Sequence, residues 1–140
     1  MGKKRIALIV VSFILCLALS GFASDIRFGQ FEGSFNAPPE PRLLYPITDE
    51  VILTGKDFLE FRWRSNFFEA DHFIFRIYKG YNMYAAGLVY KEEIKASESS
   101  IQVKADLFSD GQVYTWSLIQ VSNSGCKSDK NFNSFKIIKK

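Results

Sequence analysis

The chain has 140 residues, of which 47% are hydrophobic, 16% aromatic and 24% charged, and this composition excludes a disordered chain. The length fits one domain, because domains usually have about 100–150 residues. The formal net charge of +3 depends on three basic residues near the N-terminus, Lys3, Lys4 and Arg5. Without them the 18 basic side chains fall to 15, equal to the 15 acidic ones. A domain without net charge argues against nucleic acid as the main partner, because phosphate binding needs a clustered basic surface.

The first residues have the pattern of a secretory signal peptide. A basic start at residues 2–5 precedes an almost wholly apolar run of 14 residues, 6–19, and signal peptides contain an apolar region of about 7–15 residues. The small residues that follow predict cleavage after Ala23, with Ser20 as the alternative. We therefore expect a signal peptide over residues 1–23 and an exported bacterial protein, periplasmic or extracellular, with no stable membrane span after cleavage. A retained anchor helix is the other interpretation of the same run.

Residues 24–41 are expected to form an extended linker before the domain. Prolines at positions 38, 39 and 41 remove backbone donors and fix φ, which favours a polyproline-like extension. The segment also contains three aromatic residues: Phe28, Phe31 and Phe35. Two interpretations stay open, because these rings could fold back onto the edge of the domain or form a segment that docks onto a partner.

From residue 42 to residue 140 the pattern is that of an all-β domain. Apolar and polar residues alternate with period two between closely spaced turn residues, and no segment has a helical pattern. Seven strands are expected, over residues 43–46, 58–63, 72–78, 85–90, 101–105, 113–121 and 131–138. This number of short strands predicts a two-sheet, antiparallel, immunoglobulin-like sandwich. In the third strand, Phe73, Phe75 and Ile77 should face the core, which would place Tyr78 outside.

One segment gives this sandwich a more specific resemblance. The sequence Leu107-Phe-Ser-Asp-Gly-Gln-Val-Tyr114-Thr-Trp116-Ser-Leu118 resembles the corner and the following strand of fibronectin type III domains. The resemblance extends over about residues 41–140. It implies a seven-stranded fibronectin type III-like fold in which Leu107, Tyr114 and Trp116 have structural roles at the corner. A tyrosine at such a corner buries its ring and sends its hydroxyl to an upstream backbone group.

The sequence contains no set of residues typical of an active site or a metal site. His72, beside Asp71, is the only histidine, and no Gly-x-Ser-x-Gly segment presents a nucleophilic serine. Cys126 is the only cysteine left after cleavage, so an internal disulfide and a standard zinc site are both excluded. No glycine-rich loop suited to phosphate binding is present. We expect a non-enzymatic protein without a metal or another cofactor.

The residues that suggest binding are tyrosines around one connection: Tyr78, Tyr81, Tyr84 and Tyr90. Tyrosines in loops suit both protein contacts and stacking on sugars, although some of these rings could instead cover the edge of the sandwich. Five lysines between residues 127 and 140 could attract anionic lipids or polysaccharides, or guard an edge strand. The expected function is protein–protein interaction or structural support in the cell envelope, with an envelope or extracellular protein as partner. The alternative is a carbohydrate-binding module that uses the tyrosines to bind a polysaccharide.

Overall fold

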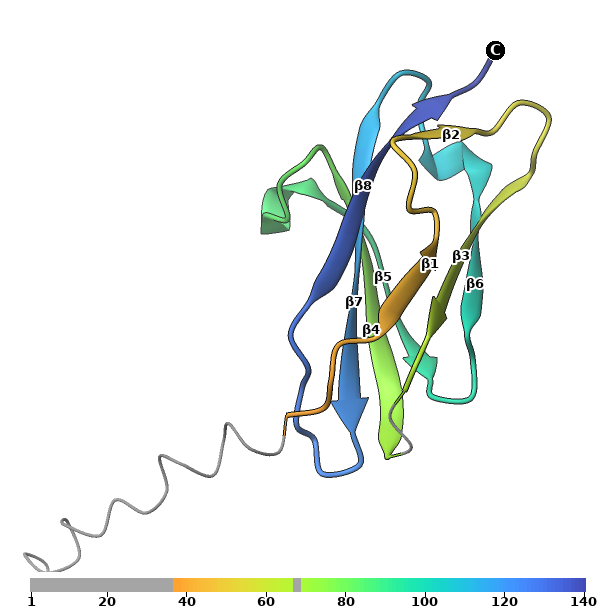
Figure 1. Ribbon diagram of the computed structural model, residues 1–140. Coiled ribbons are helices and arrows are strands. Elements are labelled where there is room, and N and C mark those ends of the chain that lie inside the picture. The colour runs from red at the N-terminus through yellow and green to blue at the C-terminus, as the bar shows by residue number, and fades with distance from the viewer. Residues whose placement is uncertain (1–36, 67–68) are drawn as a thin grey trace, which may run out of the picture. The chain divides into compact units, whose positions relative to one another are not determined.

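The computed structural model describes residues 37–66 and 69–140, which form one compact unit (Figure 1). The expected signal peptide and the segment containing Phe28, Phe31 and Phe35 lie outside the described residues. Within the described part, Pro38 and Pro41 are buried, and the carbonyls of Pro39 and Pro41 accept hydrogen bonds from the side chains of Gln120 and Asn131. The last residues of the expected linker therefore pack onto the domain. None of the described helices is long and apolar enough to cross a membrane.

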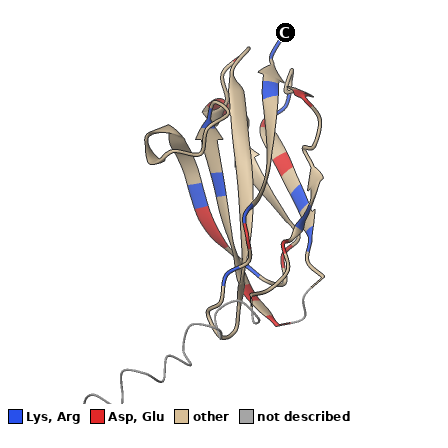
Figure 2. Ribbon diagram, turned by 60° about the vertical axis from the view of Figure 1, so that its left-hand side comes forward, with Lys and Arg blue, Asp and Glu red and all other residues tan. Residues whose placement is uncertain are grey.

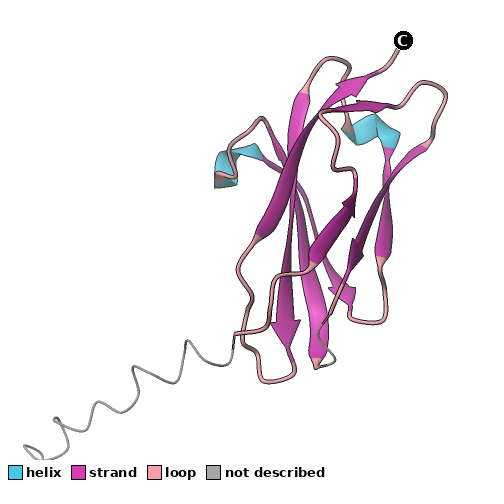
Figure 3. Ribbon diagram, in the orientation of Figure 1, coloured by secondary structure: helices cyan, strands magenta, loops and turns pink. Residues whose placement is uncertain are grey.

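The described residues form eight strands in two sheets that face each other (Figures 1 and 3). The smaller sheet has the order β1-β3-β6 and the larger has the order β2-β8-β7-β4-β5. The strands are β1 (Arg42–Tyr45), β2 (Glu50–Ile52), β3 (Phe58–Arg64), β4 (Ala70–Lys79), β5 (Leu88–Lys95), β6 (Ser100–Lys104), β7 (Val113–Ser122) and β8 (Asn131–Ile138), with two short 3-10 turns, η2 (Ala85–Gly87) and η3 (Ala105–Leu107). The expected all-β, immunoglobulin-like sandwich is confirmed.

Two details differ from the seven strands expected. The additional strand, β2, has three residues and pairs parallel with β8, so the larger sheet is not wholly antiparallel. The strand expected over residues 85–90 begins only at Leu88 and continues to Lys95, because residues 85–87 form the turn η2. A Cβ on Gly87 would lie 3.1 Å from the carbonyl oxygen of Lys79, so the chain passes close to the end of β4 before β5 begins.

The core lies between the sheets and is built from the alternating residues of each strand. In β3 the burial pattern alternates strictly, with Leu59, Phe61 and Trp63 inside. Phe61 is fully buried, and its ring centroid lies 5.0 Å from that of Phe75 in β4 and 5.2 Å from that of Trp116 in β7. Both contacts are edge-on, which is a favourable arrangement of aromatic rings. The two sheets are therefore joined by aromatic rings that come from both.

The topology leaves one long strand at the border of the larger sheet. β5 pairs with β4 on one side, and no other described strand pairs with its second side. The other border strands are shorter, because β1 has four residues, β2 three and β6 five, against eight in β5. Basic and acidic residues are scattered over both sheets without one large cluster of either sign (Figure 2).

Candidate functional site

Tyr114 has the contacts of a corner tyrosine. Its side chain is buried, with 2% of the residue exposed, and its ring stacks edge-on against Phe108 at 5.1 Å between centroids. The Ser109 N–H donates a hydrogen bond to the hydroxyl oxygen at 2.9 Å, and the hydroxyl donates to the Leu107 carbonyl at 3.4 Å. Gly111 has a positive φ of 70°, which lets the chain turn between the corner and β7. These contacts hold the loop onto the sandwich, so they serve the fold.

Trp116 also has a structural environment. It is fully buried in β7, and its indole N–H donates a hydrogen bond to the Pro46 carbonyl at 2.9 Å. This bond joins the middle of the larger sheet to the segment between β1 and β2. Leu107 is half-buried and packs against the core. Of the three residues that the resemblance assigned to the corner, Tyr114 and Trp116 are therefore inaccessible to a ligand, and only Leu107 retains some exposed surface.

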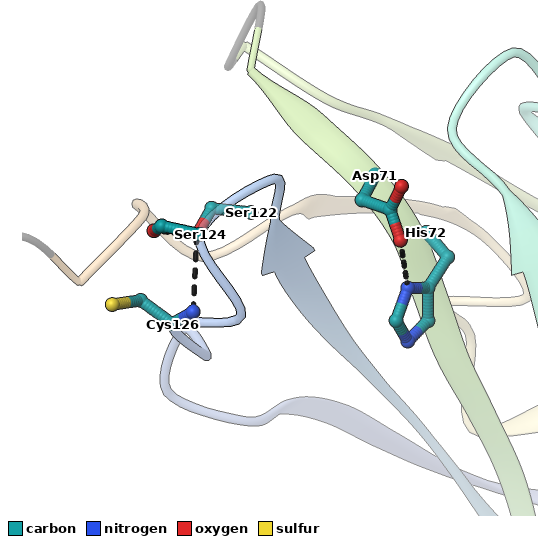
Figure 4. Close-up of polar contacts among 5 residues, drawn as sticks. All are labelled: Asp71, His72, Ser122, Ser124 and Cys126. Carbon is teal, nitrogen blue, oxygen red and sulfur yellow. Dashed lines mark hydrogen bonds and ion pairs between the residues drawn. The ribbon is translucent and has the colours of Figure 1, made fainter.

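The polar groups that could suggest catalysis do not converge (Figure 4). The His72 Nδ1 lies 2.7 Å from an Asp71 carboxylate oxygen, and among the described residues the imidazole has no other hydrogen-bond partner. The Ser122 hydroxyl instead hydrogen-bonds with Ser124 at 2.8 Å and accepts from the Cys126 backbone N–H at 3.1 Å. No three His, Cys, Asp or Glu side chains in residues 37–66 and 69–140 are placed to hold a metal ion. The described part of the chain thus contains no assembled nucleophile and base.

The expected exposure of Tyr78 is wrong. Tyr78 does follow the inward-facing Ile77, yet only 4% of the residue is exposed. On the outer face of the larger sheet it lies in register with Thr115, whose hydroxyl donates a hydrogen bond to the Gly80 carbonyl at 2.7 Å. The start of the connection after β4 is thus held against this face beside Tyr78. Alternation along one strand gives the face of a side chain but not its exposure, which depends on other segments.

The other three tyrosines separate into two environments. Tyr81 and Tyr84 lie in the connection between β4 and β5, and each is 72% exposed. Tyr90 is half-buried in β5, with its ring edge-on to Phe75 and its hydroxyl hydrogen-bonded to Glu92. The pKa of Tyr90 is raised to about 12. Partial burial is the largest cause, and the hydrogen bond to Glu92 and the negative charge of Glu92 add to it. The four tyrosines therefore do not form one binding patch, since only Tyr81 and Tyr84 are open to solvent.

A feature that the sequence analysis missed is the charge arrangement on the free strand β5. In the register of β4 and β5, Arg76 lies directly opposite Lys91, on the outer face. Glu93 lies opposite Ile74 on the same face. Like charges directly opposite each other on a sheet are destabilising, and in the described part of the chain neither Arg76 nor Lys91 makes an ion pair. No pattern in the sequence signals this pair, because the register between two strands is a tertiary property.

An open groove follows the same border of the sandwich. It lies between β5 and β6 and is lined mainly by Phe58, Tyr90, Val103 and Leu107, with polar residues at its rim. Phe58 is 47% exposed there. The free border of β5 thus has an apolar flank on the side of the core and a charged flank on the outer face.

Comparison with known proteins supports the fold alone. No protein-family model matches the sequence, and no curated protein matches it. Among solved structures, the fibronectin(III)-like modules of Clostridium thermocellum CbhA align at 13% identity with a TM-score of 0.49, over 71% of this chain and 96% of that one. An alpha-L-rhamnosidase from Dictyoglumus thermophilum aligns at 16% identity with a TM-score of 0.51, over 72% of this chain but only 12% of that chain. Together with the strand order, the alignment with the rhamnosidase supports a two-sheet β-sandwich fold.

Proposed function

We propose that this chain is an exported, non-enzymatic β-sandwich module of the cell envelope that binds another protein by strand addition at β5. The observation that carries the proposal is the free border of β5, which is eight residues long and paired only with β4 among the described strands. A free border presents unpaired backbone N–H and C=O groups, and a partner strand satisfies them. The leader over residues 1–23 supports export, and the separation of His72 from Ser122 and Cys126 supports a non-enzymatic role.

Length distinguishes β5 from the other borders. At about 3.3 Å per residue, β5 offers about 26 Å of free backbone, whereas β1, β2 and β6 have between three and five residues. Main-chain hydrogen bonds supply the affinity in strand addition, and alternate side chains supply the specificity. The charged residues of β5 therefore restrict which partner can add, since a like charge in the facing strand is disfavoured.

Site-specific photo-crosslinking tests this proposal. A photoreactive residue at position 91 or 93 of β5 should crosslink a partner in envelope extract. The matched control is position 60 in β3, where Glu60 is exposed on the smaller sheet and is also flanked by paired strands. Crosslinks from position 60 that equal those from positions 91 and 93, or no crosslinks from β5, would contradict binding at this border.

Carbohydrate binding is the second candidate, and the exposure of Tyr81 and Tyr84 favours it. A tyrosine ring can stack on the face of a pyranose at little cost in side-chain entropy. The double variant Tyr81→Ala/Tyr84→Ala should then lose binding on a glycan array, while the crosslinks from β5 stay the same. Unchanged glycan binding in the double variant, or no glycan binding by the parent chain, would remove this candidate.

A further inference from the structure

The side chains of β5 alternate between the core and the outer face in a way that its pairing with β4 fixes. Ile94 is buried opposite Phe73, so it and Tyr90 belong to the inner side of the sheet. Lys91 and Glu93 lie opposite Arg76 and Ile74 and belong to the outer face. The outer face of β5 therefore presents a positive and a negative charge two positions apart.

This arrangement places two basic side chains opposite each other without an ion pair to either of them in the described part of the chain. Lys91 faces Arg76 in the register of β4 and β5, at the distance of about 4.5–5.5 Å between Cβ atoms that directly opposite residues have. Among the described residues, the carboxylates within reach of a basic group are Glu60 beside Arg62 and Asp71 beside His72, so none of them pairs with Arg76 or Lys91. A strand that adds to β5 and places a carboxylate opposite Lys91 would remove this repulsion.

We propose that the strand that adds to β5 is β5 of a second copy, running antiparallel in a register centred on Glu92. This inference rests on the proposed function, since it uses the same free border. In this register Lys91 of each copy lies opposite Glu93 of the other, and Tyr90 lies opposite Ile94. The regular part of this pairing runs over residues 90–94, because β5 is bulged at Val89 in its pairing with β4, and it joins the two five-stranded sheets into one.

Charge and overlap together favour the register centred on Glu92 over its neighbours. A two-fold axis perpendicular to the sheet keeps each face continuous, so the register must be centred on a residue. Centring on Lys91 puts Lys91 opposite itself, and centring on Glu93 puts Glu93 opposite itself and Lys91 opposite Lys95. Both arrangements bring like charges together. Centring on Ile94 does pair Glu93 with Lys95, but only residues 93–95 of the strand then overlap. Centring on Tyr90 brings no like charges together, but it pairs Lys91 with Val89, where β5 is bulged, and overlaps only residues 88–92.

The one like-charged contact of the proposed register is between the two copies of Glu92 at the axis. Within each copy, the Tyr90 hydroxyl donates a hydrogen bond to the Glu92 carboxylate. This bond does not remove the charge, so the repulsion between the two carboxylates remains a cost of this register. Glu92 is also exposed at the border of the sandwich, where solvent screens its charge.

Charge reversal tests the register directly. Dimerisation of the exported chain and its variants is measured by sedimentation velocity at increasing protein concentration. Lys91→Glu places two carboxylates opposite each other at positions 91 and 93, and Glu93→Lys places two ammonium groups there, so each variant alone should dimerise about tenfold more weakly or worse. An equimolar mixture of the two variants restores opposite-charge pairs and should recover the dimer. The double variant Lys91→Glu/Glu93→Lys should recover it as well. The matched control is Lys95→Glu, which changes the charge equally on the same face but lies opposite Val89, and it should dimerise like the parent chain.

Several outcomes would overturn the inference. A chain that stays monomeric at every concentration up to its solubility limit excludes the dimer, and a dimer that Lys95→Glu weakens as much as Lys91→Glu excludes this register. Loss of fold does not explain a monomeric Lys91→Glu variant, because a glutamate opposite Arg76 relieves a repulsion within the chain, and a thermal melt verifies this. A monomeric chain that still crosslinks another protein from position 91 would refute the second copy as partner and leave the proposed function intact.

Discussion

Replacement of Tyr114 separates the contribution of its hydroxyl from that of its ring. Tyr114→Phe removes the acceptor of the Ser109 N–H and the donor to the Leu107 carbonyl. Leaving a buried partner unsatisfied costs about 1–3 kcal/mol. Ser109 is exposed and the contact with Leu107 is long, at 3.4 Å, so water can replace part of both bonds. We therefore expect a loss of about 1 kcal/mol in the free energy of unfolding, at the lower end of that range.

Tyr114→Ala removes the ring as well and should cost considerably more. The ring packs against Phe108 and lies 6.4 Å from the ring of Phe135, and only 2% of the residue is exposed. Truncation of a buried aromatic side chain to alanine costs about 3–5 kcal/mol. The two variants should therefore differ by about 2–4 kcal/mol, which is the contribution of the packed ring.

Urea denaturation of the parent chain and both variants measures these differences. For a domain of this size, a loss of 1 kcal/mol lowers Tm by about 4–8 °C, so thermal melts give a second reading. Tyr84→Phe is the matched control, because it removes the same hydroxyl from a residue that is 72% exposed, and it should leave the denaturation midpoint unchanged. Unchanged denaturation midpoints in both Tyr114 variants would show that neither the hydrogen bonds of the hydroxyl nor the packing of the ring stabilises the domain.

Three further predictions concern the surface and the leader. Tyr81→Ala/Tyr84→Ala should change the free energy of unfolding by no more than about 0.5 kcal/mol, because both rings are exposed; a large fall in Tm would show that they belong to the core. The raised pKa of Tyr90, about 12 against 10.0 for a free tyrosine, means that the stability it contributes is complete below pH 10 and is lost as the pH rises toward 12. Glu92→Gln should lower the pKa of Tyr90 in an ultraviolet titration, and no change would contradict the role of Glu92. N-terminal sequencing of the exported chain should begin at Ser24, whereas a sequence that begins at Met1 would contradict cleavage.

The sequence predicted best those strands whose two sides differ in environment. In β3 the outer residues are exposed and the inner ones buried, so Leu59, Phe61 and Trp63 could be assigned to the core from alternation alone. The interaction of Tyr114 with an upstream backbone group also followed from a local segment, since Leu107 and Tyr114 are only seven positions apart. Such features depend only on residues that are close in the chain, so they can be predicted from a single sequence.

The sequence failed where a contact between distant segments decides the outcome. β2 has three residues, too few for a period-two pattern, and it exists because β8 pairs with it. Tyr78 is on the expected face but is buried, and the alternation along β4 does not show which residues of other segments surround it. The opposition of Arg76 and Lys91 likewise depends on the register of two strands. Each of these facts requires knowledge of which segments meet.

The charges of β5 have two effects that are usually treated as alternatives. Charged residues on a border strand protect a protein from aggregation, because most facing strands would bring like charges together. The same charges also make one pairing specific. When a second copy of β5 runs antiparallel in the register centred on Glu92, Lys91 of each copy faces Glu93 of the other. Lys91 and Glu93 can therefore block disordered association and still allow one symmetric contact.

Substitution of both residues by threonine should broaden association into larger species. The substitution removes the charges that disfavour other pairings of β5, while threonine keeps a strand-forming sequence. If the threonine variant instead stays as monodisperse as the parent chain, then the charges of β5 do not control its association.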